Sequence, residues 1–181
     1  MASGSGTILQ AIIQALIPVE LVITDRECFA EKIATKHNIE HIRVGRSSYR
    51  KDFNRDAFTC EIRDTFIEKE IDLIAMAGFG TILSKPIYDV YANRILNTHP
   101  SLLPSFPGWH AVEEAIEYGV KVTGCTVHIA TEEVDAGPIL AQESISVFKD
   151  DTKETLHERI KEVERRLYVE TLQNIIRTEG S

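Results

Sequence analysis

The feature that most constrains the fold of this 181-residue chain is a repeated exchange between two hydrophobic periodicities. Short apolar runs rich in β-branched residues, such as 19–24 and 71–77, are typical of buried strands. Between such runs lie segments with apolar residues at helical spacing, clearest at 54–69 and 153–176. Strands that alternate with helices predict a Rossmann-like α/β fold, with a mostly parallel sheet and helices on both faces.

The same two signals place the remaining elements. The expected strands are 19–24, 40–44, 71–77, 95–98, 122–130 and 139–147, and the expected helices are 8–16, 29–37, 54–69, 111–118 and 153–176. No linker rich in proline, glycine or serine interrupts this pattern. We therefore expect a single domain over residues 1–181.

The chain opens with a glycine-rich turn where an α/β fold normally has a strand. Residues 1–7 (MASGSGT) run directly into the first helical segment, so the first strand is predicted to be nearly absent. Glycines allow close approach of a phosphate, and the N–H groups of the following helix can bind it. A tight or flexible turn without a ligand is an equally good interpretation.

Charge and composition exclude several classes of function. The chain has 20 basic and 28 acidic residues, a net charge of −8, whereas a general nucleic-acid binder needs a basic face. No apolar run approaches the roughly 20 residues of a membrane span, and the N-terminus lacks the pattern of a secretory signal. Cys28, Cys60 and Cys125 have no metal-binding spacing, which favours a reducing cytoplasm over a disulfide framework.

A polar group follows the strand expected at 95–98. Side chains two apart on an extended strand point to the same side, so Asn97 and His99 are expected to face one pocket. Histidine can move a proton near neutral pH, and asparagine can donate a hydrogen bond to an oxyanion. Asp135 follows a later strand and would stabilise a charged imidazole if it lies near His99. The alternatives are a structural histidine and an aspartate that serves only its turn.

The other polar clusters favour structural interpretations. His99, His110 and His128 are spaced by 11 and 18 residues, which matches no metal site, so core or surface roles are expected for His110 and His128. A basic run is expected to be a solvated face, with Arg55 as the exception. This run comprises Arg43, Arg46, Arg50, Lys51 and Arg55.

Several motifs, in a fixed order, resemble those of the folate-dependent formyltransferases. They are 77–79 (AGF), 82–84 (ILS), 96–104 (LNTHPSLLP), 106–108 (FPG), 123–124 (TG), 127–128 (VH) and 135–139 (DAGPI). The resemblance covers nearly the whole chain, and the stretch after residue 96 is its most specific part. The glycine-rich opening and the long last helix favour the members whose formyl acceptor is phosphoribosylglycinamide.

The resemblance implies transfer of the formyl group of 10-formyltetrahydrofolate to the amine of 5-phosphoribosylglycinamide in purine biosynthesis, without a metal. It implies that His99 is the proton donor, that Asn97 and charged His99 stabilise the oxyanion, and that Asp135 keeps His99 charged. The implied acceptor-binding residues are Gly6, Thr7 and Ile8 for phosphate, and Lys161, Glu162, Val163 and Glu164 for ribose. The implied formyl-donor residues are Arg55, Gly80, Thr81, Ile82, Leu83, Asn97, Thr131, Glu132, Glu133, Val134 and Asp135. The N-terminal part would thus bind phosphate, and the C-terminal part would bind folate and carry catalysis.

The chain also departs from the family pattern. Ile8 stands where many members carry asparagine, Gly80-Thr81 where Met-Arg is common, and Ala136 where glycine is frequent. Two rival functions follow from the resemblance: a formyltetrahydrofolate hydrolase (deformylase), and an inactive truncated relative that only binds ligand. A methionyl-tRNA formyltransferase would need a further domain and a basic surface. We expect small-molecule substrates, no nucleic acid or membrane partner, and a monomer or homodimer.

Overall fold

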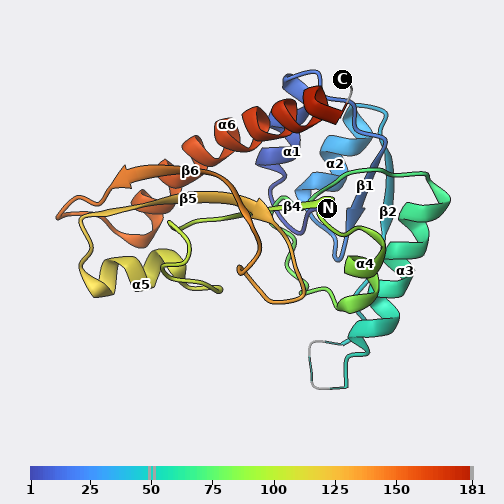
Figure 1. Ribbon diagram of the computed structural model, residues 1–181, viewed down its shortest axis with the longest axis horizontal. Coiled ribbons are helices and arrows are strands. Elements are labelled where there is room, and N and C mark those ends of the chain that lie inside the picture. The colour runs from blue at the N-terminus through green and yellow to red at the C-terminus, as the bar shows by residue number, and fades with distance from the viewer. Residues whose placement is uncertain (49, 51, 180–181) are drawn as a thin grey trace. The chain divides into compact units, whose positions relative to one another are not determined.

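The computed structural model describes residues 1–48, 50 and 52–179, and its elements are labelled in Figure 1. The chain forms two compact units, Met1–Leu96 and Asn97–Ser181. Strand β4 (Ile95–His99) contains the boundary, so its last three residues belong to the second unit. The expectation of a single domain stays a prediction.

The first unit has the predicted alternation of helices and parallel strands. Its elements are α1 (Thr7–Gln14), β1 (Leu21–Thr24), α2 (Phe29–Lys36), β2 (Glu40–Arg43), α3 (Arg55–Glu68), β3 (Ile74–Ala75) and α4 (Lys85–Val90). Strand β1 pairs in parallel with β2, from Leu21↔Glu40 to Thr24↔Arg43, and β3 pairs in parallel with the start of β4. Helix α2 packs against both β1 and β2 (Figure 1).

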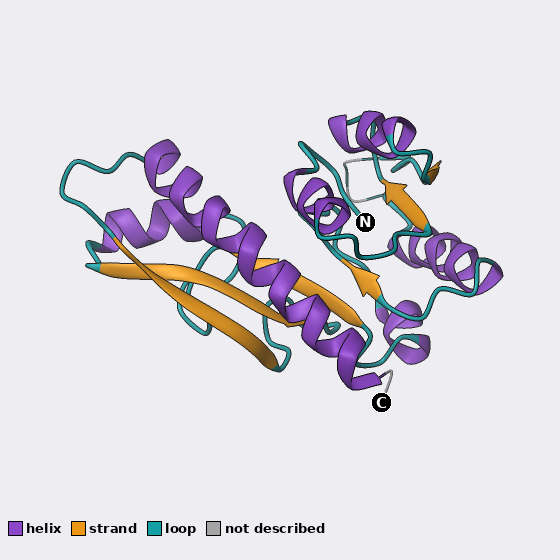
Figure 2. Ribbon diagram, turned by 90° about the horizontal axis from the view of Figure 1, so that it is seen from above, coloured by secondary structure: helices purple, strands orange, loops and turns teal. Residues whose placement is uncertain are grey.

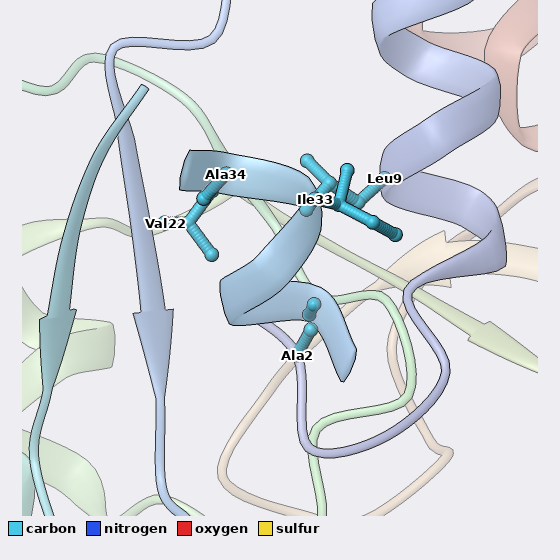
Figure 3. Close-up of a cluster of buried hydrophobic side chains, with 6 residues drawn as sticks. Ala2, Leu9, Val22, Ile33 and Ala34 are labelled. Atoms are coloured by element: carbon cyan, nitrogen blue, oxygen red, sulfur yellow. The ribbon is translucent and has the colours of Figure 1, made fainter. Parts of the chain in front are cut away.

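A small apolar cluster holds the helices of this unit on β1. Ala2, Leu9, Val22, Ile33 and Ala34 are all buried and lie together in Figure 3. Helices α1 and α2 supply Leu9 and the Ile33–Ala34 pair from their amphipathic faces, as helical spacing predicts. The start of α1, where a ligand phosphate is expected, is thereby fixed by packing.

Residues 1–3 form an extended stub beside β1. Ala2 makes an isolated parallel bridge with Thr24, and its N–H donates to the Ile23 carbonyl over 3.0 Å. On its other side the stub bonds to the segment after β3, where Ser3 N–H donates to the Gly78 carbonyl over 3.1 Å. Among the described residues before α1, this isolated bridge is the only β-pairing and no strand is formed. The prediction that the first strand is nearly absent is therefore confirmed.

The second unit is built on an antiparallel pair. After the end of β4 it contains α5 (Ala111–Tyr118), β5 (Val122–Ile129), β6 (Ile139–Ser146) and α6 (Lys153–Glu179). Strands β5 and β6 pair from Val122↔Ser146 to His128↔Ile139, with an irregularity between Val127 and His128. Helix α6 packs along both strands, and Figure 2 shows it lying over them.

Two elements differ from the sequence prediction. Strand geometry in the expected run 71–77 is limited to Ile74–Ala75, although Met76 N–H still bonds to the Leu96 carbonyl. Helix α4 was not predicted, because six residues beginning Lys-Pro carry too little periodicity. Among the described residues, no helix has the length and apolar character needed to cross a membrane.

Gly124 allows β5 and β6 to approach closely, and its replacement should destabilise the fold. A Cβ at this position would lie 2.0 Å from the Glu143 carbonyl oxygen. Because the backbone must move, we expect Gly124→Ala to lower the free energy of unfolding by about 3 kcal/mol, measured by urea denaturation. Gly45→Ala is the control, since a Cβ there would meet no atom within 4 Å. Equal losses in the two variants would contradict this explanation.

Candidate active site

The end of β4 directs alternate side chains to different partners. The Asn97 amide nitrogen lies 3.2 Å from His128 Nε2, and His99 Nδ1 lies 3.3 Å from Asp135 Oδ2. Asp135 Oδ1 is also 3.7 Å from His128 Nε2, so Asn97 and His99 belong to one group of side chains. Thr98, between them, instead donates its hydroxyl proton to Glu164. The prediction of a shared site for Asn97 and His99 therefore agrees with this geometry.

His99 is held between two hydrogen-bond acceptors. Besides Asp135 at Nδ1, its Nε2 lies 2.7 Å from the Phe106 carbonyl oxygen. A carbonyl and a carboxylate can only accept, so both contacts are satisfied when both ring nitrogens carry hydrogen. The side chains of His99 and Asp135 are each 6% exposed, which leaves water little access to compete for these bonds. The imidazole ring is thus held in place from both sides.

Asp135 is both a turn residue and the partner of His99. Its φ of +57° lies in the left-handed region, which aspartate tolerates better than most residues. Gly108 N–H donates to its Oδ2 over 2.8 Å, so the carboxylate also ties down the loop before α5. The turn requires Gly137, because a Cβ there would lie 1.8 Å from the Ile129 carbonyl oxygen. Asp135 therefore fills both roles that the sequence left open, because it serves its turn and also contacts His99.

His128 was expected in a core or surface role, but it is a member of this site. It is 1% exposed, and burial is the main reason that its pKa lies below the ordinary value of 6.5. Its Nδ1 lies 3.0 Å from the Ile129 carbonyl, so a neutral ring donates there and leaves Nε2 to accept from Asn97. This contact fixes the orientation of the Asn97 amide. The sequence signal for His128 was the Val127-His128 pair on β5, which is one of the family motifs.

The proline-containing loop after β4 is fixed by Thr126. The Thr126 hydroxyl donates to the Ser101 carbonyl over 2.7 Å and accepts from Leu103 N–H over 3.1 Å. Gln142 donates to the same hydroxyl and to the Leu103 carbonyl. This loop supplies the Phe106 carbonyl and the Gly108 N–H, so Thr126 indirectly positions His99 and Asp135.

Other predicted residues of the second unit lie on α6 and on the loop after β5. Burial raises the pKa of Glu164, and the Thr98 hydroxyl, 2.8 Å from Glu164 Oε1, opposes that rise. Lys161 is paired with Glu158 on the exposed side of α6. In the loop, Thr131 donates to the Glu133 carbonyl over 2.9 Å. The remaining predicted residues are exposed or half-buried, namely Glu132, Glu133, Val134, Glu162 and Val163.

The glycine-rich turn of the first unit presents helix N–H groups. Gly6 has φ +68° and is packed against Ala30 and Ile33, so a side chain there would clash. Helix α1 has no side-chain cap, and its first backbone bond comes from Gln10 N–H to the Gly6 carbonyl. The N–H groups of Thr7 and Ile8 come before that bond in the helix, so they have no acceptor within it. Because the Ile8 side chain is buried, any phosphate contact at residue 8 would come from its N–H.

The segment expected to bind the formyl donor turns its side chains inward. Thr81 and Leu83 are 2% and 1% exposed, and the Thr81 hydroxyl donates to Asp25 over 2.7 Å. Gly80 lies next to Arg26, since an added Cβ would be 2.7 Å from Nη2 of that side chain. Arg55, the first residue of α3, is exposed. Sequence reasoning missed Asp25 and Arg26 because no motif marks them.

The basic run is not simply a solvated face. Arg43 makes a bidentate pair with buried Glu31, with bonds of 2.7 and 2.5 Å, and Arg46 lies 4.2 Å from the centre of the Phe53 ring. These two guanidinium groups hold β2 and the loop after it. Their spacing in the sequence does not indicate these roles, because only the fold brings their partners close. Lys51 lies outside the described residues. Within the described part of the chain, no three His, Cys, Asp or Glu side chains are grouped as metal ligands.

Comparison with known proteins assigns the chain to a class. Residues 1–172 match the formyl transferase family model, so the chain belongs to the formyl transferase family. It is similar to the phosphoribosylglycinamide formyltransferase of Mycobacterium tuberculosis, with 43% identity over 174 residues, covering 93% of this chain and 80% of that protein. The crystal structure of phosphoribosylglycinamide formyltransferase from Bacillus halodurans has a TM-score of 0.89 and 40% identity, covering 97% of this chain and 92% of that one.

A formyltetrahydrofolate deformylase is a weaker match. The structure of that enzyme from Pseudomonas syringae has a TM-score of 0.85 and 25% identity. The match covers 94% of this chain but 58% of that one. The family and the fold predicted from the sequence are thus confirmed, and the transferases fit the chain better than the hydrolase.

The buried neutral state of His128 should make stability depend on pH. Its pKa is lowered in the folded state, so below pH 6.5 the unfolded chain binds more protons than the folded one. This contribution to stability is present above pH 6.5 and is lost as the pH falls below it. We expect urea denaturation between about pH 7 and about pH 5 to show a weaker pH dependence for His128→Gln than for the wild type. An unchanged pH dependence would contradict a neutral, buried His128.

Proposed function

We propose that this protein transfers the formyl group of 10-formyltetrahydrofolate to the amine of 5-phosphoribosylglycinamide, giving the formylglycinamide ribonucleotide of purine biosynthesis. The observation that carries the proposal is the group formed by half-buried Asn97 and the buried side chains of His99, His128 and Asp135. It lies in a chain whose relatives include phosphoribosylglycinamide formyltransferases along most of its length. The formyl donor serves as a cosubstrate.

The addition step would use Asn97 and His99. The glycinamide nitrogen attacks the formyl carbon, a C–N bond forms, and the carbonyl π electrons move to oxygen. The Asn97 amide nitrogen carries two hydrogens, of which one is directed to His128 and the other can donate to the oxyanion. His99 is held tightly at Nε2, 2.7 Å from a carbonyl, and more loosely at Nδ1, 3.3 Å from Asp135. Its Nδ1 proton, which has the longer contact, is therefore the one that would be shared with the substrate oxygen.

The collapse step would use Asp135. The added amine carries one proton too many, and the departing N10 of tetrahydrofolate needs one when its bond to the formyl carbon breaks. A carboxylate beside the reacting atoms can accept the first proton and return it to N10, directly or through water. No proton is consumed overall. The bond from Gly108 N–H keeps the carboxylate in place during this exchange.

Binding of the two substrates is divided among the remaining residues. The start of α1, at Gly6, Thr7 and Ile8, would take the phosphate, because its N–H groups point out of the helix. On α6, Glu164 and its neighbours Lys161, Glu162 and Val163 would take the ribose hydroxyls, for which a carboxylate is a suitable acceptor. The formyl donor would contact Arg55, main-chain groups of residues 80–83, Asn97 and the loop 131–135.

We also propose a cytoplasmic location and a monomer or homodimer. The free thiols Cys28, Cys60 and Cys125 suit a reducing compartment, and purine biosynthesis uses soluble substrates. Sedimentation equilibrium of the purified protein would distinguish the two oligomeric states.

Release of tetrahydrofolate from 10-formyltetrahydrofolate tests the function directly. Release that requires phosphoribosylglycinamide is the expected result and identifies a transferase. Equal release without the amine would identify the deformylase reaction instead, with water as the acceptor. Calorimetric binding of both ligands without release in either condition would identify a relative that only binds.

Loss of the Asn97 amide should slow the chemical step. We expect Asn97→Ala to lower kcat by about 10²- to 10³-fold, the usual cost of removing one oxyanion donor, with a smaller change in KM. Asn174→Ala, at an exposed position of α6, is the matched control and should retain the wild-type kcat. A kcat for Asn97→Ala within a few fold of the wild type would contradict the assigned role.

A further inference from the structure

The first unit contains a buried carboxylate, Asp25, that has several hydrogen-bond donors. Asp25 follows β1 and is 2% exposed. Arg26 donates to it twice, from Nε to Oδ1 over 3.0 Å and from Nη2 to Oδ2 over 3.1 Å. The Thr81 hydroxyl donates to Oδ2 over 2.7 Å, and the Ser3 hydroxyl is near enough to help lower the pKa of this carboxylate. The mechanism proposed above uses none of these bonds.

The hydroxyl neighbours of Asp25 come from two loops that are far apart in the sequence. Ser3 begins the glycine-rich turn that leads to the start of α1, whereas Thr81 belongs to the segment 80–83. The two loops also meet directly, because Gly80 N–H donates to Ser3 Oγ over 2.5 Å and Ser3 N–H donates to the Gly78 carbonyl. Asp25 thus accepts a bond from one loop and has Ser3 of the other loop as a neighbour. All these residues lie in the first unit.

We propose that Asp25 is a positioning residue that fixes the phosphate-binding turn and the formyl-donor segment relative to each other. The inference rests on the proposed function, which assigns one substrate to each loop. Asp25 itself contacts neither substrate in this proposal. It acts through Ser3 on one loop and through Thr81 on the other.

The arrangement also gives Thr81 of the donor segment a role. Its hydroxyl supplies the donor that reaches Oδ2. The Arg26 guanidinium, which completes the bonding of Asp25, lies next to Gly80, where an added Cβ would be 2.7 Å from its Nη2. Thr81 therefore serves the bonding of Asp25, and the ligand contacts of this segment fall to its main chain.

Asp25→Asn is the direct test, because the amide has nearly the same shape. One carboxylate oxygen becomes an NH2 group that faces a donor from Arg26 or Thr81, so at least one of the bonds that fix this side chain is lost, together with its charge. Glu31→Gln is the matched control. Glu31 is also a buried carboxylate of the first unit with a bidentate arginine and a threonine hydroxyl, but its partners Arg43 and Thr24 lie outside both loops.

Equilibrium binding would be measured by calorimetry, separately for phosphoribosylglycinamide and for tetrahydrofolate, together with KM and kcat. For Asp25→Asn we expect both dissociation constants and both KM values to rise about tenfold, the effect of one charge-assisted hydrogen bond, with kcat at saturation nearly retained. For Glu31→Gln we expect thermal stability to fall while both dissociation constants stay within about twofold of the wild type. A merely structural role of Asp25 would lower stability in the same way without moving the dissociation constants.

Three results would overturn the proposal. They are a rise for one ligand only with Asp25→Asn, unchanged binding of both ligands by a folded Asp25→Asn, and an equal rise with Glu31→Gln. If Asp25→Asn does not fold, Ser3→Ala removes only the hydroxyl between Gly80 and Asp25, and it must weaken both ligands for the proposal to stand. A wild-type protein that binds neither ligand would instead contradict the proposed function on which the inference rests.

Discussion

The candidate active site depends on one carboxylate, which a left-handed turn directs back towards the end of β4. At φ +57° the backbone of Asp135 places its side chain against His99 and the Gly108 N–H, with 6% of that side chain exposed. The turn exists only because Gly137 lets the chain pass the Ile129 carbonyl without a Cβ. The Thr126 hydroxyl fixes the loop that supplies the other contacts of His99 and Asp135. Removing any of these supports would move the Asp135 carboxylate away from His99.

Two histidines a few ångströms from the same carboxylate have opposite electrostatic surroundings. His99 faces hydrogen-bond acceptors at both ring nitrogens. His128 is buried, and that burial is the main reason that its pKa is lowered. A donor and a neutral acceptor can then act side by side, the first on the substrate oxyanion and the second on the Asn97 amide. The division follows from what meets the other ring nitrogen, which is the Asp135 carboxylate for His99 and the Asn97 amide for His128.

Buried carboxylates organise the first unit in a similar way. Glu31 and Asp25 each combine a bidentate arginine with a threonine hydroxyl. Bonds from Arg43 lower the pKa of Glu31 to about 2, and at Asp25 burial opposes the hydrogen bonds but the pKa is still lowered. Both groups therefore stay ionised. The bonds of Glu31 join α2 to β1 and β2, whereas the Thr81 bond of Asp25 holds a loop that has no strand or helix of its own. A buried charge with this many donors is stable, whereas losing one donor would leave it partly unsatisfied.

The sequence by itself determined the alternation of elements, the near absence of a first strand and the placement of Asn97 and His99 on one strand end, because each depends on local periodicity or local turn chemistry. It also determined the family, through motifs that stand close together along the chain. The tertiary structure decided that His128 joins the site, that Asp135 serves both its turn and His99, and that Asp25 accepts bonds from Arg26 and Thr81. These contacts join residues up to dozens of positions apart, and a short polar residue carries no local pattern that identifies a distant partner. Only the folded backbone brings the donors and the acceptors within hydrogen-bond distance.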